Sequence, residues 1–517
     1  MDNLKTYREY FDNMGSLNYF GRLGKTFMTQ KNYYYYDMGT GKVARVNKNV
    51  YIVLKVLTED GNFKKVMDIG LTEEELLAAF KEIKLGVEKE NILSARPLNT
   101  LTGSPVLELE ENLENKLSSL LLEVTEKCNL RCKYCIYNSG HSEFRNFGHK
   151  DMDFDIAKKA IDFVLKHSSQ TEDEVVVGFY GGEPLLNFRL IKQCVQYVKN
   201  QAENYNRKIG FSMTTNATLI NKEIADFLTD NDFNIIISLD GPKELHDENR
   251  VDINGNGSFN NTIAGIKTLL RSRNVKHKEK SPLVFNMVVD GENVVEKYDK
   301  IQKFLDNSPW MPENIQVLIS AIDYSPKECT YIKPQTKREL AYSENRMDPL
   351  TFWSDNVVIE KNKSLFSEAS LNKGLHRIHN RLYSDKPVEA YGMNGCCVPG
   401  HRRMYVTVSG SILPCEKVGD IPPIGHVDDG FWIDSIKKHY VYDFIEEAKK
   451  YCKECWAVNL CGLCYTNCYD GEGIHYNYRH QLCVEERIYL SNLLSRYYSI
   501  LEVNPEMLKE LDNMEIR

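Results

Sequence analysis

The amino-acid sequence predicts an α/β fold built on a parallel β-sheet. In the middle of the chain, short apolar runs rich in β-branched residues alternate with longer segments whose apolar residues recur at helical spacing. This alternation indicates parallel strands joined by helical crossovers. Polar motifs follow directly after several of the apolar runs, and barrel enzymes carry their chemistry at such strand ends. The sequence therefore predicts a partial, TIM-like (β/α)6 barrel.

Each strand is expected where an apolar run is bounded by polar or turn-forming residues. The expected strands are residues 119–124, 174–180, 208–215, 233–239, 283–289 and 315–320. Helices are expected between most of them, including residues 154–166, 190–200 and 222–228. These elements define a barrel domain over residues 113–325. Residues 326–395 are expected to form a helical bridge, and residues 486–517 a C-terminal helix.

Residues 1–112 form a separate segment with its own pattern. The expected strands are residues 33–37 and 43–46, around a glycine turn, and the expected helices are residues 48–57 and 72–84. Thr72 is the expected N-cap of the second helix, and Glu75 follows at the spacing of a capping box. Such a module resembles the winged-helix domains that recognise leader peptides. The competing interpretation is an extension that only stabilises the barrel.

Length, charge and hydropathy limit the class of protein. The 517 residues are enough for several domains, each with its own core. Lys and Arg number 65 against 73 Asp and Glu, and the resulting net charge of -8 predicts no basic surface for nucleic acid. The sequence opens without the basic-then-apolar order of a signal peptide, and no apolar stretch reaches about eighteen residues. We therefore expect a soluble cytoplasmic protein with no nucleic-acid or membrane partner.

The 14 cysteines are concentrated in two parts of the chain. Three lie at residues 128–135 and nine at residues 396–483, which leaves Cys194 and Cys329 isolated. Because thiols stay reduced in the cytosol, clustered cysteines indicate metal or cluster ligation rather than disulfides. The two isolated cysteines are expected to act as small buried hydrophobes.

The first group, Cys128, Cys132 and Cys135, has the spacing C-x3-C-x2-C. Three thiolates can hold three irons of a four-iron cluster and leave the fourth iron open. This motif resembles that of the radical S-adenosylmethionine (SAM) enzymes, in which SAM chelates the open iron and is cleaved to a 5'-deoxyadenosyl radical. A zinc knuckle is the competing interpretation of the triplet alone.

The GGEP motif directly follows an expected strand and suits a ligand site. Gly181 and Gly182 lack side chains, so we expect the backbone to approach the ligand closely. Glu183 can accept a hydrogen bond from the SAM ammonium, and Pro184 is expected to fix the turn.

The resemblance implies further SAM-binding residues at the following strand ends. Ser238 and Asp240 of ISLDGP would contact the ribose or carboxylate region of SAM, and Asn216 would assist from the neighbouring strand end. Arg250 has the fork geometry that pairs with a carboxylate. Tyr134, inside the triplet, is the aromatic residue expected beside the adenine.

The second group of cysteines resembles a SPASM domain, the auxiliary-cluster module of radical SAM enzymes that modify peptides and proteins. We expect this domain at residues 396–485. By the family pattern, one four-iron cluster, here called the outer cluster, would take Cys452, Cys455, Cys461 and Cys483. The inner cluster would take Cys397, Cys415 and one ligand from the later group.

This chain departs from the family pattern after Cys461. It continues with Cys464 and Cys468, so either of these two could supply the inner ligand. Cys396 either completes the inner cluster or leaves it with an open iron that could bind a substrate thiolate. A structural zinc module remains the competing interpretation.

The combined resemblance implies a peptide maturase with SAM and three [4Fe-4S] clusters. Within that class the chain looks like the thioether-forming sactipeptide and ranthipeptide enzymes, such as the maturase of ruminococcin C. Its partners would be a Cys-containing precursor peptide with a leader, and an electron donor such as flavodoxin or ferredoxin. Alternatives are an anaerobic sulfatase-maturating enzyme that generates formylglycine, a carbon–carbon crosslinking or epimerising peptide maturase, and a zinc-binding scaffold without activity. No side chain can be named from the sequence as a general acid or base.

Overall fold

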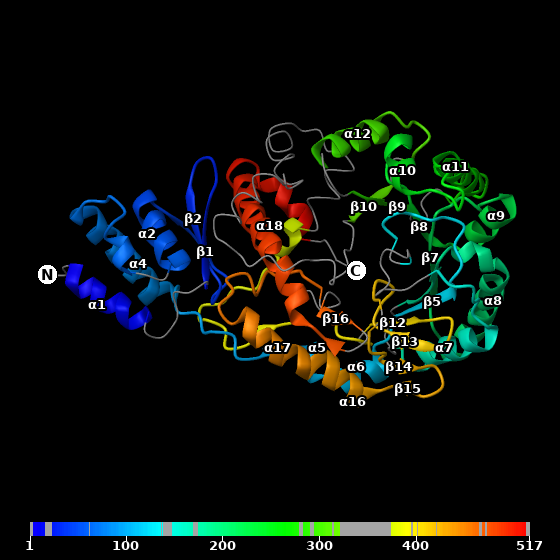
Figure 1. Cartoon of the computed structure of the whole chain (residues 1–517), viewed down its shortest axis with the longest axis horizontal. Coiled ribbons are helices and arrows are strands. Elements are labelled where there is room, and N and C mark those ends of the chain that lie inside the picture. Colours follow the sequence, from blue (N-terminus) through cyan, green and yellow to red (C-terminus); the bar gives the residue numbers. More distant parts are fainter. Residues whose placement is uncertain are drawn as a thin grey trace.

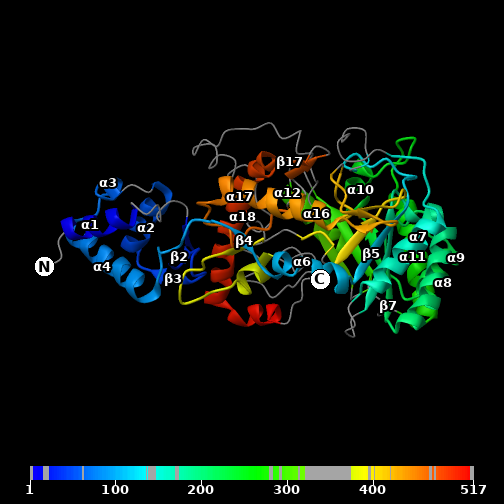
Figure 2. The ribbon, with the colours of Figure 1, turned by 90° about the horizontal axis from the view of Figure 1, so that it is seen from below.

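The computed structural model describes most of the chain. The described residues are 4–15, 23–60, 63–135, 137, 147–168, 174–278, 283–289, 294–312, 315–320, 374–393, 397–400, 402–419, 421–464, 468–470 and 473–512. In Figures 1 and 2 the N-terminal residues and the barrel lie at opposite ends of the molecule. The C-terminal segment occupies the space between them.

A mostly parallel sheet forms the barrel end of the molecule, as predicted. Its strands are β5 (Ser119–Thr125), β6 (Val175–Gly181), β7 (Ile209–Thr215), β8 (Asn234–Ser238), β9 (Leu283–Val288) and β10 (Gln316–Ser320). They pair in parallel and in chain order from β5 to β10. Each strand begins and ends within one residue of its expected bounds. The prediction of an α/β fold with a parallel sheet is therefore confirmed.

Helices connect successive strands and cover the outside of the sheet (Figure 1). They are α7 (Phe154–Lys166), α8 (Phe188–Tyr205), α9 (Lys222–Asp230), α10 (Lys243–Asn249), α11 (Phe259–Val275) and α12 (Val294–Asp306). In α7 the buried residues recur every three or four positions, so one face of the helix packs on the strands. The helix has the bounds that its apolar spacing predicts. A 3-10 turn, η2 (Pro184–Asn187), precedes α8 and contains the proline of GGEP.

The sheet continues beyond β5 into strands from the C-terminal segment. These are β12 (Arg403–Val406), β13 (Ser411–Leu413), β14 (Gly425–His426) and β15 (Gly430–Phe431). Strand β12 pairs in parallel with β5, with Arg403 opposite Ser119 and Val406 opposite Leu122. The local sequence does not reveal this pairing, because the two strands are far apart in the chain. Its consequence is that Cys415 lies just after β13, a strand of the barrel sheet itself.

The N-terminal module contains a three-stranded antiparallel sheet with helices on one side. Its elements are α1 (Leu4–Gly15), β1 (Gly24–Met28), β2 (Tyr33–Asp37), β3 (Val43–Val46), α2 (Lys48–Asp60), α3 (Phe63–Val66) and α4 (Glu73–Glu90). The expected hairpin is the β2–β3 pair, and the capping box of Thr72 and Glu75 is present. Helix α1 and strand β1 were not expected. Because β1 pairs with β2, β3 is the edge strand next to the turn.

The module packs against the C-terminal helix α18 (Tyr476–Val503). Glu502, near the end of α18, accepts hydrogen bonds from Thr29 Oγ1 at 2.8 Å, Asn32 Nδ2 at 2.9 Å and Tyr34 Oη at 2.6 Å. The ring of Tyr34 also contacts Tyr498 of the same helix. These contacts fix the module to the C-terminal segment, while strand β3 carries none of them.

The remaining elements lie between the module and the barrel. They are β4 (Leu101–Thr102), α5 (Ser104–Leu107), α6 (Leu109–Asn115), β11 (Tyr391–Gly392), α16 (Ile433–Ile436), η3 (Lys437–Tyr442), α17 (Asp443–Cys452), β16 (Tyr469–Asp470), β17 (Gly473–Ile474) and η5 (Pro505–Leu511). Helix α18 begins at Tyr476, well before the expected start of the C-terminal helix at residue 486, and includes Cys483. Most of the expected bridge at residues 326–395 lies outside the described residues, as do Cys329 and Cys396. Among the residues described, every helix is too short or too polar to traverse a lipid bilayer.

Candidate active site

The cysteine triplet lies in the loop that leaves the carboxyl end of β5. Arg131 ties this loop together, because its Nη1 donates to the carbonyl oxygens of Cys128 at 2.7 Å and Leu130 at 2.8 Å. The loop is also anchored to the segment after α10, where the main-chain N–H of Arg131 donates to the carbonyl of Val251 at 2.7 Å. The guanidinium of Arg131 stacks 4.3 Å from the centre of the Phe147 ring. These contacts hold the loop in place without using the thiols.

The thiols of this triplet are largely buried and influence one another electrostatically. Burial is the main cause that raises the pKa of Cys128 to about 12 and that of Cys135 to about 11, and neighbouring Cys132 raises both further. Thiolates packed this closely need a cation to be stable. Among the described residues, no three His, Cys, Asp or Glu side chains converge closely enough to hold a single metal ion. A four-iron cluster does not require three side chains to converge on one ion, because each thiolate binds a different iron.

The two glycines of GGEP allow β6 to approach the cysteine loop. A Cβ atom at Gly181, whose φ is +132°, would lie 2.2 Å from the carbonyl oxygen of Thr125. A Cβ at Gly182 would lie 2.1 Å from the carbonyl oxygen of Lys127. A side chain at either position would therefore displace the start of the cluster loop. Close approach was expected toward a ligand, whereas these contacts are with the protein backbone.

Glu183 is a fully buried carboxyl group at the wall of the site. It accepts hydrogen bonds from Thr215 Oγ1 at 2.7 Å, the N–H of Asn216 at 2.8 Å and the N–H of Leu185 at 3.2 Å. Burial raises the pKa of Glu183 to about 7, although these three donors act in the opposite direction. A cationic ligand beside this carboxyl group would favour its charged form.

Asn216 connects the end of β7 to the cysteine loop. Its Nδ2 donates to Asn129 Oδ1 at 3.0 Å, and its Oδ1 accepts from the hydroxyl of Thr218 at 2.6 Å. The same hydroxyl accepts from Asn129 Nδ2 at 2.8 Å. Asn216 therefore positions the loop between the first two cysteines of the triplet as well as lining the site.

Asp240 is the centre of a buried network behind the site. Its Oδ2 accepts from Tyr134 Oη at 2.5 Å and from Arg250 Nε at 2.9 Å, and its Oδ1 accepts from the N–H of Val288 at 3.0 Å. Only 2% of the Asp240 side chain and 7% of the Arg250 side chain are exposed. The guanidinium of Arg250 lies 5.3 Å from the centre of the Tyr134 ring. Asp240 therefore orients two predicted SAM-binding residues.

These residues surround a cavity of about 210 Å³. The expected residues that line it are Cys128, Cys132, Tyr134, Cys135, Gly181, Gly182, Glu183, Asn216, Ser238 and Arg250. Pro184 and Asp240 are outside this lining. The cavity also has lining residues that sequence reasoning missed, and Asn286, Ser320 and Lys417 are three of these. Asn286 and Ser320 could have been found from their positions on expected strands. Lys417 could have been found from its position two residues after Cys415.

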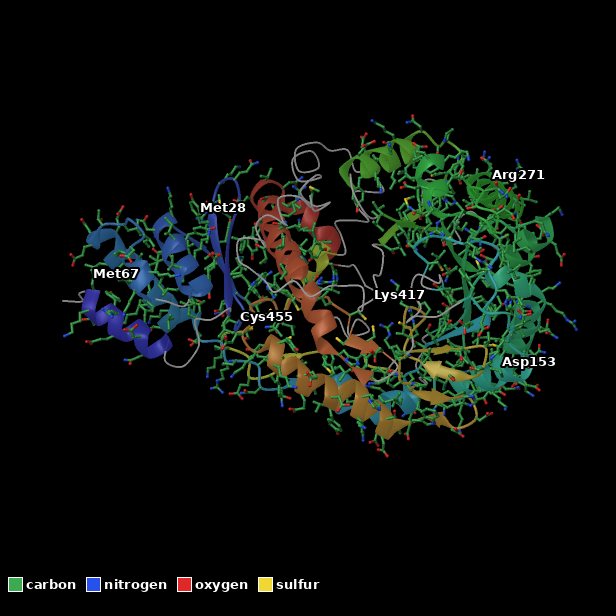
Figure 3. All side chains as sticks on the ribbon, viewed as in Figure 1. Met28, Met67, Asp153, Arg271, Lys417 and Cys455 are labelled. Carbon is green, nitrogen blue, oxygen red and sulfur yellow. The ribbon has the colours of Figure 1, made fainter. Side chains whose placement is uncertain are left out.

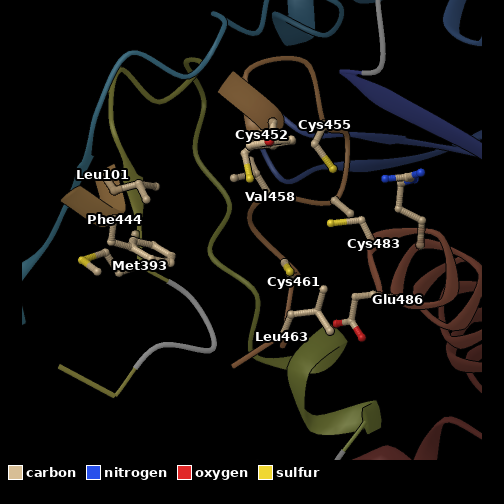
Figure 4. A pocket seen from close by; sticks show the side chains of 14 residues that line it. Leu101, Met393, Phe444, Cys452, Cys455, Val458, Cys461, Leu463, Cys483 and Glu486 are labelled. Atoms are coloured by element: carbon tan, nitrogen blue, oxygen red, sulfur yellow. The ribbon is translucent and has the colours of Figure 1, made fainter. Parts of the chain in front are cut away.

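The four cysteines expected for the outer cluster line a second cavity, of about 40 Å³ (Figure 4). Cys452, Cys455 and Cys461 come from the end of α17 and the turns after it, and Cys483 comes from α18. Burial raises the pKa of Cys483 to about 12, and the charges of the other three thiolates raise it further. The four side chains are thus brought together from two separate elements.

The inner set consists of Cys397, Cys415 and Cys464 in the described part of the chain. Burial and then the charge of Cys464 raise the pKa of Cys397. Burial is also the main cause that raises the pKa of Cys415 to about 12, to which Cys464 and Cys397 contribute. Cys468 is fully buried and belongs to a different turn, at the start of β16. Cys464 therefore lies within electrostatic range of both Cys397 and Cys415.

Comparison with known proteins identifies relatives over most of the chain. The family model described as the radical SAM superfamily matches residues 122–304. An uncharacterised protein of Methanocaldococcus jannaschii is 30% identical over 316 residues, which are 60% of this chain and 90% of that protein. A cysteine-type anaerobic sulfatase-maturating enzyme of Clostridium novyi is 28% identical over 362 residues, which are 68% of this chain and 87% of the enzyme.

A solved structure shares the fold of the greater part of this chain. The structure of native anSMEcpe with bound AdoMet and Cp18Cys peptide superposes with a TM-score of 0.53 at 22% identity. The match covers 77% of this chain and 99% of that one, so nearly a quarter of this chain has no counterpart there. Because the family model, the relatives and the mostly parallel sheet agree with the triplet of cysteines, the chain belongs to the radical SAM superfamily.

Proposed function

We propose that this chain is a peptide maturase that joins a cysteine sulfur to a carbon atom within a ribosomally made precursor peptide. The observation that carries the proposal is the position of the 210 Å³ cavity. Its lining includes the cysteine triplet and also Lys417, which is two residues from Cys415 of the inner set. A cavity that is lined by the triplet and by a residue close in the chain to Cys415 suits a reaction in which a hydrogen atom leaves a substrate carbon and an electron leaves the product.

The lining residues fit SAM in several ways. When bound at an open iron of the triplet's cluster, SAM supplies a radical that removes hydrogen from unactivated carbon. Glu183 is proposed to accept from the ammonium group of SAM, since its buried carboxyl group gains from a cation. Arg250, held by Asp240, is proposed to pair with the SAM carboxylate. Tyr134 is proposed to lie beside the adenine.

Other residues of the site shape or support this pocket. Gly181, Gly182, Asn216 and Ser238 line the cavity and are proposed neighbours of SAM. Asp240 is proposed to position Arg250 and Tyr134 rather than to contact SAM. Each role depends on where the side chain lies relative to the cavity.

Two auxiliary four-iron clusters are proposed to take electrons from the reaction. The outer cluster would be held by Cys452, Cys455, Cys461 and Cys483. The inner one would be held by Cys397, Cys415 and Cys464. Thioether formation removes one hydrogen atom from carbon and one proton from the thiol, which leaves one electron to be carried away. The inner cluster is nearer in the chain to Lys417, so we propose that it receives this electron first, and that flavodoxin or ferredoxin exchanges electrons with the enzyme.

The N-terminal module is proposed to hold the leader of the precursor. Strand β3 is the edge of a three-stranded sheet within the described residues, and a peptide strand can add to such an edge through main-chain hydrogen bonds. A leader held there would raise the local concentration of the core peptide at the barrel.

The second candidate function is anaerobic sulfatase maturation. It is favoured by the 28% identity to the Clostridium novyi enzyme over 87% of its length. Both reactions begin by removing hydrogen from a peptide residue, so the barrel site fits either. They differ in the fate of the sulfur atom. A thioether product retains sulfur and loses two hydrogens, whereas the conversion of cysteine to formylglycine removes sulfur and creates an aldehyde.

Mass spectrometry of the product separates these functions. The reconstituted enzyme is incubated anaerobically with SAM, dithionite and a small Cys-containing peptide encoded beside its gene. A product that is lighter by two hydrogens, retains sulfur and no longer reacts with iodoacetamide supports thioether formation. A product that has lost sulfur and reacts with a hydrazine supports formylglycine formation and overturns the first proposal. The matched control is the triple Cys→Ala variant at residues 128, 132 and 135, which should make no 5'-deoxyadenosine and hold about eight rather than about twelve irons.

A further inference from the structure

Two neighbouring tyrosines of β2 face opposite sides of the N-terminal sheet. Tyr35 is buried in the module's own core, with residues of α2 and α4. Tyr36 belongs instead to the core that extends into the C-terminal segment. Both are almost completely buried, at 1% and 0% exposure. The alternation of a β-strand thus sends one tyrosine into the module and the next toward the outer cysteine set.

Tyr36 packs against the residue that directly follows Cys455, a ligand of the proposed outer cluster. Its ring meets that of Trp456 edge to face, with centroids 6.2 Å apart, and Trp456 immediately follows Cys455. The same turn contacts the module through Asn459, whose Nδ2 donates to the carbonyl of Met38 at 2.9 Å. In Figure 4 the blue strands of the module pass beside Cys455. Strand β2 is therefore attached to the loop that carries Cys452, Cys455 and Cys461.

The hydroxyl group of Tyr36 is buried and has no hydrogen-bond partner among the described residues. Buried hydroxyls in folded proteins almost always have a partner, because losing water without replacement is unfavourable. A nearby tyrosine, Tyr391, illustrates the rule, since its hydroxyl donates to the carbonyl of Arg96 at 2.7 Å. Burial first, and then nearby charges that include Asp37 and Cys455, raise the pKa of Tyr36, so this hydroxyl keeps its proton. It is therefore a buried, unpaired donor beside the turn that carries Cys455.

We propose that the Tyr36 hydroxyl donates a hydrogen bond to a sulfur atom of the outer cluster, at the corner held by Cys455. This inference rests on the proposed function only in that it requires the outer cluster. A hydrogen bond to a cluster sulfur stabilises the more negative, reduced state and so raises the reduction potential. The module proposed to hold the leader thus also contributes a residue that tunes the cluster. Tyr36 is a positioning and tuning residue, since it does not reach the SAM cavity.

The test compares Tyr36→Phe with Tyr35→Phe, which removes an equally buried hydroxyl from the opposite face. Both are made in the full chain that lacks the thiols of Cys128, Cys132 and Cys135, so that only auxiliary clusters contribute to the spectrum. The reconstituted proteins are titrated with reductant and followed by electron paramagnetic resonance. Tyr36→Phe should lower the ratio of reduced to oxidised outer cluster about tenfold at a fixed potential, equivalent to about 59 mV for a one-electron couple. The signal of the other auxiliary cluster should not move.

Thermal unfolding provides a second readout that needs no redox assignment. Tyr36→Phe should leave the melting temperature of the metal-free protein unchanged or raised, because the hydroxyl is unpaired there. It should lower the melting temperature of the reconstituted protein, in which the hydroxyl has its partner. Equal effects on both forms would overturn the proposal.

The outcomes also separate this proposal from the proposed function. About eight irons per chain with no shift of either potential, or with the same shift in Tyr35→Phe, overturns the role of Tyr36 alone. Iron near zero in these proteins without the triplet, with zinc in the auxiliary sites, overturns the outer cluster and the Tyr36 bond together. A shift confined to one signal and to Tyr36→Phe supports the proposal.

Discussion

The hydroxyl of Tyr134 donates a 2.5 Å hydrogen bond to the carboxylate of Asp240, which joins the cysteine loop to the end of β8. The same carboxylate oxygen accepts from Arg250, so one buried anion orients both the aromatic and the cationic residue of the proposed SAM site. This arrangement differs from the role that the sequence motif implied for Asp240, which was direct contact with SAM. It also means that Arg250 is already paired before any ligand arrives.

Substitutions of Asp240 and Arg250 should have strongly non-additive effects on the free energy of unfolding. Asp240→Asn leaves a buried guanidinium without its counter-ion, and breaking such a pair costs about 3 to 5 kcal/mol. The Asp240→Leu/Arg250→Leu double variant should cost less than the sum of the two single Leu variants, because neither charge is then left alone. Anaerobic urea unfolding of all variants measures these free energies. Strictly additive losses would show that the two side chains do not depend on one another.

Much of the fold was predictable because its signals are local. The strands of the barrel are mostly apolar runs bounded by polar or turn-forming residues, and their bounds can be read directly from composition. The pairing of β12 with β5 was not predictable in this way, since it depends on which edge of the barrel the distant Arg403 region reaches. The strand β1 was also missed, because GKTFM contains little apolar alternation.

The candidate site was predictable where a sequence motif directly follows an expected strand. Glu183 follows a strand within GGEP, and it lines the cavity as expected. Lys417 was missed because only the folded chain brings this residue, two positions after Cys415, to the cavity. Spacing alone also left Cys464 and Cys468 equivalent. In the folded chain the charge of Cys464 acts on both Cys397 and Cys415, whereas Cys468 is fully buried next to β16.

Lys417 should matter for the peptide rather than for SAM. It lines the cavity from the C-terminal segment, and Figure 3 labels it near the place where that segment meets the barrel. Lys417→Met removes the ammonium group at nearly constant length, and we expect peptide turnover to fall by at least about tenfold, roughly 1.4 kcal/mol. Uncoupled 5'-deoxyadenosine formation should change less than twofold. Liquid chromatography of both products measures the two rates in one reaction.

The control for this variant is Lys438→Met. Lys438 is an exposed lysine of the same C-terminal segment, and it is not among the residues that line the cavity. It should have no effect on either rate. If Lys417→Met slows SAM cleavage and peptide turnover equally, Lys417 belongs to the SAM site, contrary to the prediction.

Arg45 tests the proposed leader site on the edge strand. In an antiparallel pair, alternate residues direct their main-chain groups toward the partner strand and away from it. The N–H of Asp37 donates to the carbonyl of Lys42 across the turn, so these two residues form a hydrogen-bonded pair. Tyr34 and Arg45 lie opposite one another three pairs further along the ladder, where the pair is not hydrogen-bonded. The N–H of Arg45 therefore points to the free edge of β3. Arg45→Pro removes this donor without breaking the β2–β3 ladder. Binding of the precursor peptide should weaken by at least about tenfold, roughly 1.4 kcal/mol.

Two further variants make this result specific. Arg45→Ala removes the same side chain but keeps the N–H, so it should bind the leader nearly as well as the unaltered chain. Ala44→Pro lies opposite Tyr35, within the ladder, and should destabilise the module itself. Isothermal titration with the leader segment and thermal unfolding separate these effects. Equal binding by the Pro and Ala variants of Arg45 would rule out strand addition at this edge.

His246 should make the protein sensitive to mild acid. Its Nδ1 accepts from the N–H of Asp240 at 3.4 Å, and its Nε2 lies 3.0 Å from Ser258 Oγ, which itself donates to the carbonyl of Arg250. This pattern fits a neutral ring with its proton on Nε2. Burial is the main cause that lowers the pKa of His246 to about 4, and Arg250 acts in the same direction. The effect of Lys243 is similar, whereas Asp240 and Asp247 oppose it.

The lowered pKa of His246 sets the direction of the pH effect. The neutral ring contributes its full stability above the unfolded pKa of 6.5, and the contribution is lost as the pH falls from 6.5 toward 4. At pH 5 the loss should be about 2 kcal/mol relative to pH 7.5. His246→Gln cannot take up this proton, so the difference in unfolding free energy between the two proteins should shrink by that amount on acidification. Urea unfolding at both pH values measures it, and parallel losses in the two proteins would show that His246 does not control the response.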